Sequence, residues 1–542
     1  MATGEKLGCR FPDTVYTALV HPEQHLGFKY TGFHPGKTQK LPRDLAIPMR
    51  DGIKLYADIF RPANEHEQVP AIIPWSPYGK VGTSTLSSDN MRPWHIGMSY
   101  QNLSGYERLK YGPNPAEWCS RGCAVVDVDA RGCGNSEGDL MFWGQQEATD
   151  ICDSITWIAQ QPWCKGSIVR MGNSWLAILQ LNFASRFSHP NLKAIAPWEG
   201  LSDPYGQRSC RGGIPRLSFA DLTIQAFADK PENIRDITMY LTASYSTLLH
   251  FEGSFHSFEV AQTPRKWLRL HASQEWHDLY RSEAMNDLQR FFDFYAKGVQ
   301  NGWEKDAPPV RLSLLGYDGS YAKSVVERPE QQWPPARQHM RRYYLDAASL
   351  SLATTKPDTP SQVAHEGHSL TDSSDFVLYF DGYTEVCGRP FVKLCMSCDI
   401  RKISSSGELL ESLNWSPMPK PGPEVPNINI AKHLGQQGMF RASHHVSLRP
   451  HQGGDEVPQY NHKARQPITP GVAVPLLIPI WPVGMVFEAG EGLMLRVSGH
   501  DMAFPEAENL RPTSPVDENR GIHTVYTGGK HESCLMVPVI TD

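Results

Sequence analysis

The stretch SIVRMGNSWLAILQLNF, residues 167–183, runs from an apolar segment through a short turn into a segment compatible with a helix. A tight strand-to-helix turn would present the Ser174 hydroxyl at the carboxyl end of a sheet, with the first amides of the helix pointing back at it. This geometry favours an oxyanion, so Ser174 is a candidate nucleophile. The match to G-x-S-x-G is incomplete, because Trp175 follows the serine and the next small residue is Ala177. A serine at a helix start is also a common N-cap, so this stretch alone leaves both interpretations open.

The residues on both sides of this turn alternate between short apolar runs and helix-like segments. Between about residues 44 and 200 the alternation is carried by PAIIPWSPY (70–78), GCAVVDVDARG (122–132), EATDICDSITWIAQQ (147–161) and LKAIAPWEG (192–200). It predicts βαβ units around a mostly parallel sheet, and hence an α/β fold. Residues 201–237 interrupt this alternation of apolar runs and helix-like segments. An insertion at this point would lie over the strand ends as a helical cap. The predicted α/β domain therefore comprises residues 1–200 and 238–307.

The sequence pattern changes from about residue 308 onward, where helix-like segments stop. Short alternating strands separated by turn residues dominate there, for example VRLSLLGY (310–317) and LMLRVSGHD (493–501). Regularly spaced short strands of this kind are typical of an all-β sandwich or jelly roll. We therefore expect residues 308–542 to form a C-terminal all-β domain.

Composition limits the function classes. The 542 residues are 40% hydrophobic and 20% charged with a net charge of −6, which fits a globular protein of two or three domains and offers no basic surface for nucleic acid. No segment approaches the roughly twenty apolar residues of a membrane span. The cysteine count of eleven is odd, which favours reduced thiols in a cytoplasmic protein. The expected partner is a small-molecule substrate; no motif calls for a metal or organic cofactor, and a homodimer stays open.

Several separated motifs occur in an order that resembles one family. WSPYGK (75–80), PAEWCSRGCAVVDVDARGCGNSEG (115–138), the turn at Ser174 and GMFRASHH (438–445) together are similar to the cocaine esterase and Xaa-Pro dipeptidyl-peptidase family of serine hydrolases. The resemblance covers almost the whole chain. It implies an α/β-hydrolase domain with a helical cap insertion and a C-terminal jelly-roll domain. It also implies attack by Ser174 on an ester or amide carbonyl, with the oxyanion held by the Tyr78 hydroxyl and the backbone amide of Trp175.

The catalytic acid and base depart from the family pattern. The family places an aspartate after the strand that follows the cap and a histidine after the next strand, where this chain reads TASYSTLLH (242–250) and LHASQEWHDLY (270–280). The expected aspartate is absent. In one alternative, the match to the family pattern is shifted by two residues, so that His277 takes the place of the family histidine as the base. Another carboxylate, Glu252 or Asp203, then orients it. In the other, which we slightly prefer because it needs no gap, His250 is the base and Glu275 the acid. His271 and His256 are further candidates for the base.

The segment 81–118 is rich in aromatic and sulfur side chains, among them Trp94 and His95. Such a lining would suit an apolar or aromatic small molecule, although the same side chains could form a core beneath the cap. The leading hypothesis is a serine hydrolase that cleaves an ester, lactone or amide through an acyl-enzyme. The alternatives are non-hydrolytic acyl transfer, cyclisation or rearrangement in small-molecule metabolism, and a catalytically silent ligand-binding protein.

Overall fold

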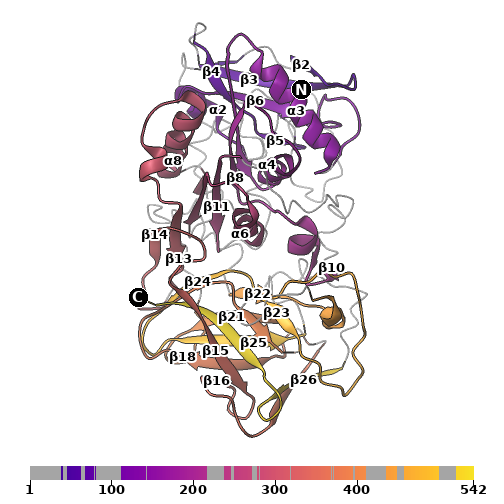
Figure 1. Ribbon diagram of the computed structural model, residues 1–542, viewed down its shortest axis with the longest axis vertical. Helices are drawn as coiled ribbons and strands as arrows, with labels where there is room; N and C mark the ends of the chain where they lie inside the picture. The colour runs from indigo at the N-terminus through magenta and orange to yellow at the C-terminus, as the bar shows by residue number, and fades with distance from the viewer. Residues whose placement is uncertain are drawn as a thin grey trace, which may run out of the picture.

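The structure is a computed structural model. It describes residues 38–40, 45–62, 67–78, 80, 112–141, 143–215, 237–245, 250–271, 278–279, 281–317, 319–367, 369, 371–394, 397–410, 435–448, 457–499 and 521–541. Two large sheets lie one above the other along the long axis of the molecule, and helix α6 (Phe251–Val260) lies near their junction (Figure 1).

The first sheet forms the α/β domain. Its path is β1-β3-β6-β4-β7-β8-β11-β12-β13-β14, with β2 beside β3 and β5 beside β6. The strands from β6 through β4, β7, β8, β11 and β12 to β13 pair in parallel, whereas β3 and β14 pair antiparallel at the two sides. The strands are β1 (Thr38–Lys40), β2 (Leu45–Pro48), β3 (Lys54–Pro62), β4 (Val69–Ile72), β5 (Trp75–Ser76), β6 (Ala124–Asp129), β7 (Cys164–Asn173), β8 (Leu192–Trp198), β11 (Met239–Ser244), β12 (Lys266–His271), β13 (Val310–Leu314) and β14 (Val325–Glu330).

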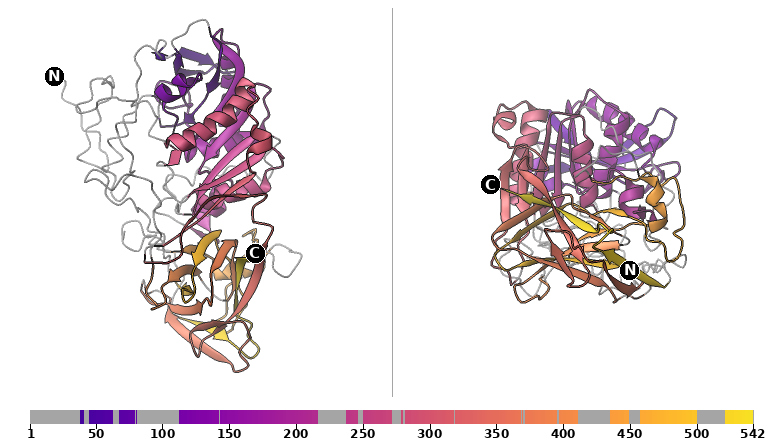
Figure 2. Two further views of the ribbon diagram at one scale, coloured as in Figure 1. Left: turned by 90° about the vertical axis from the view of Figure 1, so that its left-hand side faces the viewer. Right: turned by 60° about the horizontal axis from the view of Figure 1, so that its bottom comes forward.

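Helices cover both faces of this sheet (Figures 1 and 2). The central strands are apolar on both sides; all six residues of β6 are buried, as parallel strands covered by helices require. On one face pack α3 (Gln145–Ala159) and α4 (Trp175–Arg186), and on the other α2 (Pro115–Ser120) and α8 (Ser282–Phe292). Helix α8 buries Leu288, Phe291 and Phe292 along one side, as its amphipathic pattern predicts. It continues into a π-helix, η4 (Asp293–Lys297), and the short helix α9 (Trp303–Asp306).

The second sheet forms the β domain. Its path is β22-β21-β25-β18-β16-β15-β27-β19-β24, with β20 and β23 joined to it, and β17 and β26 form a separate pair. The C-terminal strand β27 pairs antiparallel with the long strand β15. The elements are β15 (Gln338–Asp346), β16 (Ser351–Ala353), β17 (Ser361–Glu366), β18 (Ser374–Tyr379), β19 (Thr384–Gly388), β20 (Phe391–Lys393), β21 (Ser397–Ile403), β22 (Gln436–Gly438), the 3-10 helix η5 (Ala442–Ser447), β23 (Leu477–Pro479), β24 (Val483–Phe487), β25 (Gly492–Ser498), β26 (Ile522–Thr527) and β27 (Cys534–Ile540).

The sheet topology adds a feature at the predicted domain boundary. Strand β13, which we assigned to the C-terminal domain from residue 308, pairs in parallel with β12, and β14 follows it at the edge of the first sheet. Alternating apolar residues identify a strand but carry no information about which sheet the strand joins. Strands β13 and β14 thus extend the first sheet at its edge.

In the predicted cap, the described residues form a π-helix, η3 (Tyr205–Ser209), and the short strands β9 (Cys210–Arg211) and β10 (Ile214–Pro215). Residues 216–236, where we expect the cap helix, lie outside the described residues. In the part of the chain that the structure describes, no helix is long and apolar enough to cross a bilayer.

Candidate active site

Ser174 lies on a strained turn between β7 and α4. Its backbone angles are φ 57° and ψ −116°, a conformation that costs a non-glycine residue about 1–3 kcal/mol and is concentrated at functional sites. The Ser174 amide donates to the carbonyl oxygens of Trp198 at 3.0 Å and Glu199 at 3.2 Å, so the end of β8 holds the turn. The Ser174 side chain makes no capping hydrogen bond to α4, which disfavours the N-cap interpretation.

The Ser174 hydroxyl faces a histidine from a distant part of the chain. Its Oγ lies 2.9 Å from His250 Nε2, a hydrogen-bonding distance. His250 is 3% exposed and directly precedes α6, and the segment that carries it follows β11. The loop after β11 and the turn after β7 thus meet at the carboxyl edge of the parallel sheet, where ligand sites of α/β folds gather.

The other predicted site residues are distributed as follows. Glu275 and His277, the alternative acid and base, lie outside the described residues, as do Trp94 and His95 of the predicted substrate lining. The remaining candidate acids contact other groups: both Glu252 oxygens accept from Arg389 Nη1, and Asp203 Oδ1 accepts the amide of Gly206 at 3.1 Å. His256 Nδ1 lies 2.8 Å from the Ser202 hydroxyl.

His271, a further candidate for the base, contacts carboxylates. It ends β12, and its Nε2 lies 3.1 Å from Glu199 Oε1 and 3.8 Å from Asp278 Oδ2. Glu199 directly follows β8 and is fully buried with φ 54°, yet it did not emerge from the sequence analysis. Its position directly after a predicted strand, in APWEG (196–200), is the sequence feature that could have identified Glu199 as a candidate site residue.

The two residues that carry the predicted oxyanion donors, Tyr78 and Trp175, are in contact within an aromatic cluster. Tyr78 packs edge-on against Trp175 with ring centroids 5.9 Å apart, and Trp175 packs against Trp143 at 4.7 Å. Trp175 is the first residue of α4, so its amide belongs to the positive N-terminal end of that helix. The Tyr78 ring, the N-terminus of α4 and the Ser174 turn therefore lie close together.

A buried ion pair fixes the turn that carries Tyr78. The Lys80 amide donates to Asp129 Oδ1 at 2.6 Å, and Lys80 Nζ lies 3.0 Å from Asp129 Oδ2. The two side chains are 3% and 2% exposed. Asp129 ends β6, and the glycine turn after it is packed so closely that a Cβ at Gly134 would lie 2.2 Å from Asp129 Oδ2. The glycine-rich motif after β6 thus packs against Asp129, the residue whose ion pair with Lys80 holds the turn that carries Tyr78.

A second buried carboxylate supports the aromatic cluster. Glu147 accepts hydrogen bonds from Trp75 Nε1 at 3.1 Å and from the Trp143 amide at 2.9 Å. Burial raises the pKa of Glu147 to about 8, against the opposing effect of these two donors and of Arg170.

A cavity of about 260 Å³ lies between the two domains, next to α6. Ser174 is not among its lining residues. The ion pairs of Arg389 with Glu252 at 2.8 Å and Glu259 at 2.9 Å join α6 to the β domain along this cavity. Arg211 stacks on Trp481 with its guanidinium 3.5 Å from the ring centroid. Across the described ranges, no group of three or more His, Cys, Asp or Glu side chains is arranged to hold a metal ion.

Comparisons with known proteins agree with this architecture. The family model of the X-Pro dipeptidyl-peptidase (S15 family) matches residues 51–290, and the model of the X-Pro dipeptidyl-peptidase C-terminal non-catalytic domain matches residues 301–536. A crystal structure of a CocE/NonD family hydrolase from Staphylococcus aureus is similar with a TM-score of 0.81 and 25% identity, over 98% of this chain and 100% of that chain. An α-amino acid ester hydrolase shares the fold, with a TM-score of 0.64 at 15% identity.

Curated relatives match over shorter segments. Cocaine esterase from Rhodococcus is 31% identical over 162 residues, which cover 30% of this chain and 24% of that protein. A Mycobacterium bovis protein named as a serine esterase is 30% identical over 182 residues, and the match spans 27% of its length. The two family models follow one another along most of the chain, and the structural likeness extends over nearly all of it. The chain belongs to the CocE/NonD, X-Pro dipeptidyl-peptidase-like family of serine hydrolases, with an α/β-hydrolase domain and a C-terminal all-β domain.

Proposed function

We propose that this protein hydrolyses an ester, lactone or amide of an apolar small molecule through an acyl-enzyme on Ser174, with His250 as the general base. The observation that carries the proposal is the distance of 2.9 Å between Ser174 Oγ and His250 Nε2 at a strained strand-to-helix turn. A nucleophilic serine needs a base within about 2.6–3.2 Å, and this pair meets that requirement. In the family pattern the histidine follows β12, so a base after β11 is a change of loop and not of chemistry.

The steps follow from the positions of these groups. Ser174 Oγ attacks the carbonyl carbon while His250 Nε2 accepts the hydroxyl proton. The carbonyl oxygen becomes an oxyanion, for which the Tyr78 hydroxyl and the Trp175 amide are the proposed donors. Collapse of this intermediate breaks the bond to the leaving alcohol or amine, which takes the proton from His250. Water then attacks the acyl carbon while His250 accepts its proton. Collapse of this second intermediate breaks the bond to Ser174 Oγ, which takes the proton from His250, and the acid is released.

The proposed acid and the proposed substrate class are supported by the sequence and by the aromatic side chains beside the serine. Glu275, the proposed acid behind His250, lies outside the described residues, and its role follows from its position after β12 in the sequence. The preference for an apolar substrate is supported by the aromatic cluster of Tyr78, Trp175 and Trp143 beside the serine, and by the aromatic segment that holds Trp94 and His95. The relative named cocaine esterase acts, by its name, on an ester.

The positions of base and acid are exchanged relative to the family pattern, which motivates a second candidate reaction, transfer of the acyl group to a nucleophile other than water. The same acyl-enzyme could pass its acyl group to an amine or alcohol of the substrate instead of water, which would give transfer, cyclisation or rearrangement. Hydrolysis in ¹⁸O-water puts the label into the released acid, whereas transfer to another nucleophile leaves the product unlabelled.

Stopped-flow turnover of p-nitrophenyl butyrate tests the proposal. Wild-type protein should give a burst of p-nitrophenol, stoichiometric with enzyme when deacylation limits the rate, followed by steady turnover. Ser174→Ala should lose both phases, and Ser405→Ala, an exposed serine of the β domain, is the matched control and should behave as wild type. Turnover that survives in Ser174→Ala would refute the nucleophile, and no turnover in any variant would favour a ligand-binding protein.

A further inference from the structure

The turn after β8 connects the two proposed catalytic residues. The carbonyl oxygen of Glu199 accepts from the Ser174 amide at 3.2 Å. The amide of the next residue, Gly200, donates to Ser254 Oγ at 3.0 Å, and both the amide and the hydroxyl of Ser254 are bonded to the His250 carbonyl, at 3.0 and 3.3 Å. Glu199 therefore contacts the backbone of the nucleophile directly. Its neighbour Gly200 is linked through Ser254 to the backbone of the base.

The same turn is packed between the helices that begin at these residues. A Cβ at Gly200 would lie 3.1 Å from Ala177 Cβ on α4, and a Cβ at Gly253 on α6 would lie 2.5 Å from Leu201 Cα. The backbones therefore approach as closely as glycine allows. A displacement of the turn would move α4 and α6, and with them the spacing between Ser174 and His250.

Glu199 is held in an unfavourable conformation at the centre of this arrangement. Its φ of 54° is one that non-glycine residues adopt when the surroundings over-determine it. The side chain is fully buried and directed to the end of β12, where Glu199 Oε1 lies 3.1 Å from His271 Nε2. This contact joins the residue after β8 to the last residue of β12 across the intervening strand β11.

His271 lies beside a buried ionic group. Its Nε2 lies 3.8 Å from Asp278 Oδ2, and Asp278 accepts a two-pronged interaction from Arg269 at 2.6 and 2.8 Å. Arg281 adds a contact to Asp278 at 3.0 Å. Although burial alone would raise it, the pKa of Asp278 is held well below its usual range by Arg269, His271 and Arg281, so this anchor is a carboxylate.

We infer that Glu199 and His271 are positioning residues of the catalytic site: their contact fixes the β8 turn that sets the distance between Ser174 and His250. The inference rests on the proposed function, because it concerns the spacing of the proposed nucleophile and base. It also gives His271, which lies on the strand after which the family places its base, a role other than proton transfer.

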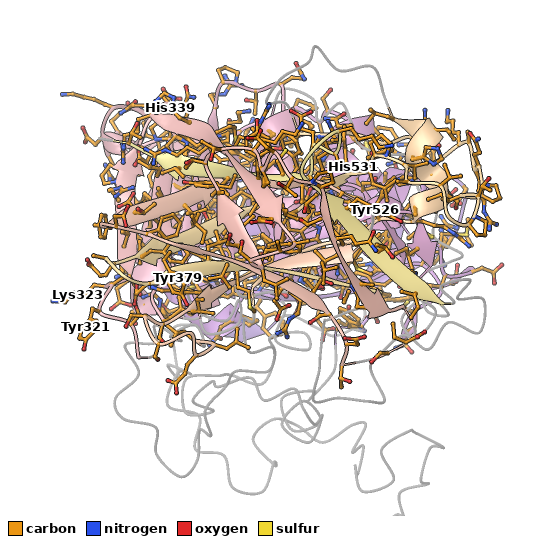
Figure 3. The ribbon with its side chains drawn as sticks, turned by 90° about the horizontal axis from the view of Figure 1, so that it is seen from below. Tyr321, Lys323, His339, Tyr379, Tyr526 and His531 are labelled. Carbon is orange, nitrogen blue, oxygen red and sulfur yellow. The ribbon has the colours of Figure 1, made fainter. Side chains whose placement is uncertain are left out.

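The pair His271→Leu and His271→Gln tests the inference by steady-state kinetics on p-nitrophenyl butyrate. Leucine removes the polar nitrogen that lies 3.1 Å from Glu199 Oε1, whereas glutamine places an amide nitrogen near the position of Nε2. His271→Leu should lower kcat by about 10²-fold, the effect of a displacement of roughly 1 Å in a catalytic group, with KM little changed. His271→Gln should restore most of kcat, and the acid limb of its pH–kcat/KM profile should keep the wild-type midpoint. His339→Leu, at an exposed position of β15 (Figure 3), is the matched control.

Glu199→Gly provides a second test that does not depend on how His271→Leu folds. Glycine adopts the left-handed conformation without strain, so this variant should fold at least as well by circular dichroism and thermal melting while its kcat falls. Wild-type kcat in Glu199→Gly or in folded His271→Leu would overturn the inference and leave the proposed function intact. Equal loss in His271→Gln and His271→Leu, with loss of the acid limb, would make His271 the base and overturn both. A wild-type protein without turnover would refute the proposed function, and with it this inference.

Discussion

Replacement of Lys80 by methionine should both destabilise the protein and slow its chemistry. The Lys80 ammonium lies 3.0 Å from Asp129 Oδ2, and both side chains are almost completely buried. Removal of one partner of a buried ion pair costs about 3–5 kcal/mol, because the other charge is left without compensation. The Lys80 amide would still donate to Asp129 Oδ1, so we expect the lower end, about 3 kcal/mol, or about 10²-fold in the unfolding equilibrium.

The effect on activity arises from the position of Tyr78, two residues before Lys80. If the ion pair holds this turn, Lys80→Met should lower kcat by about 10²-fold, the cost of a displacement of roughly 1 Å. Urea unfolding followed by tryptophan fluorescence gives the stability change, and turnover of p-nitrophenyl butyrate gives kcat. Lys323→Met, an exposed lysine of the segment that leads into β14 (Figure 3), is the control.

A double-mutant cycle separates the ion pair from side-chain packing. Lys80→Met combined with Asp129→Asn should be less destabilised than the sum of the two single variants, because no unpaired charge stays buried. Additive losses would show that the two charges do not interact. A Lys80→Met protein with wild-type midpoint and kcat would show that the ion pair neither stabilises the fold nor positions Tyr78.

Three further outcomes follow from the site. Tyr78→Phe should lower kcat by about 10²-fold as the loss of one oxyanion donor, in the same stopped-flow assay, and an unchanged kcat would remove Tyr78 from the oxyanion site. His250→Ala should lower kcat by at least about 10³-fold, with circular dichroism to confirm folding, whereas a small loss would transfer the base to another residue. Glu147→Gln should flatten the pH dependence of the unfolding free energy, measured in urea at several pH values: with its pKa raised from 4.5 to about 8, Glu147 contributes stability that is present below pH 4.5 and lost as pH rises to about 8. An unchanged slope between these pH values would contradict a protonated Glu147.

The local parts of the fold and site were predictable from the sequence. The strand-to-helix turn at Ser174 involves neighbouring residues, and the buried run of β6 and the amphipathic pattern of α8 identify those elements directly. His250 was a candidate because it follows a predicted strand, and the structure places its Nε2 at 2.9 Å from the serine. Features that depend on adjacent residues are thus visible in a single chain.

The features that the sequence could not provide depend on contacts between distant residues. Glu199 became prominent through a left-handed φ of 54° and a contact to His271, 72 positions further along, and neither has a local signature. Strand β13 looks like any strand of the β domain, but it pairs with β12. The ion pair of Lys80 with Asp129 joins residues 49 positions apart. Sequence patterns specify which segments are strands or helices, whereas tertiary packing selects their partners.

We propose that Ser174 is a nucleophile activated by His250. Intact-mass detection of a fluorophosphonate adduct tests it most directly, with Ser174→Ala and His250→Ala as variants and a known serine hydrolase as positive control. We expect a single adduct on wild-type protein, none on Ser174→Ala and a strongly slowed reaction on His250→Ala. An unlabelled wild-type protein alongside a labelled positive control, or an adduct that persists in Ser174→Ala, would contradict it.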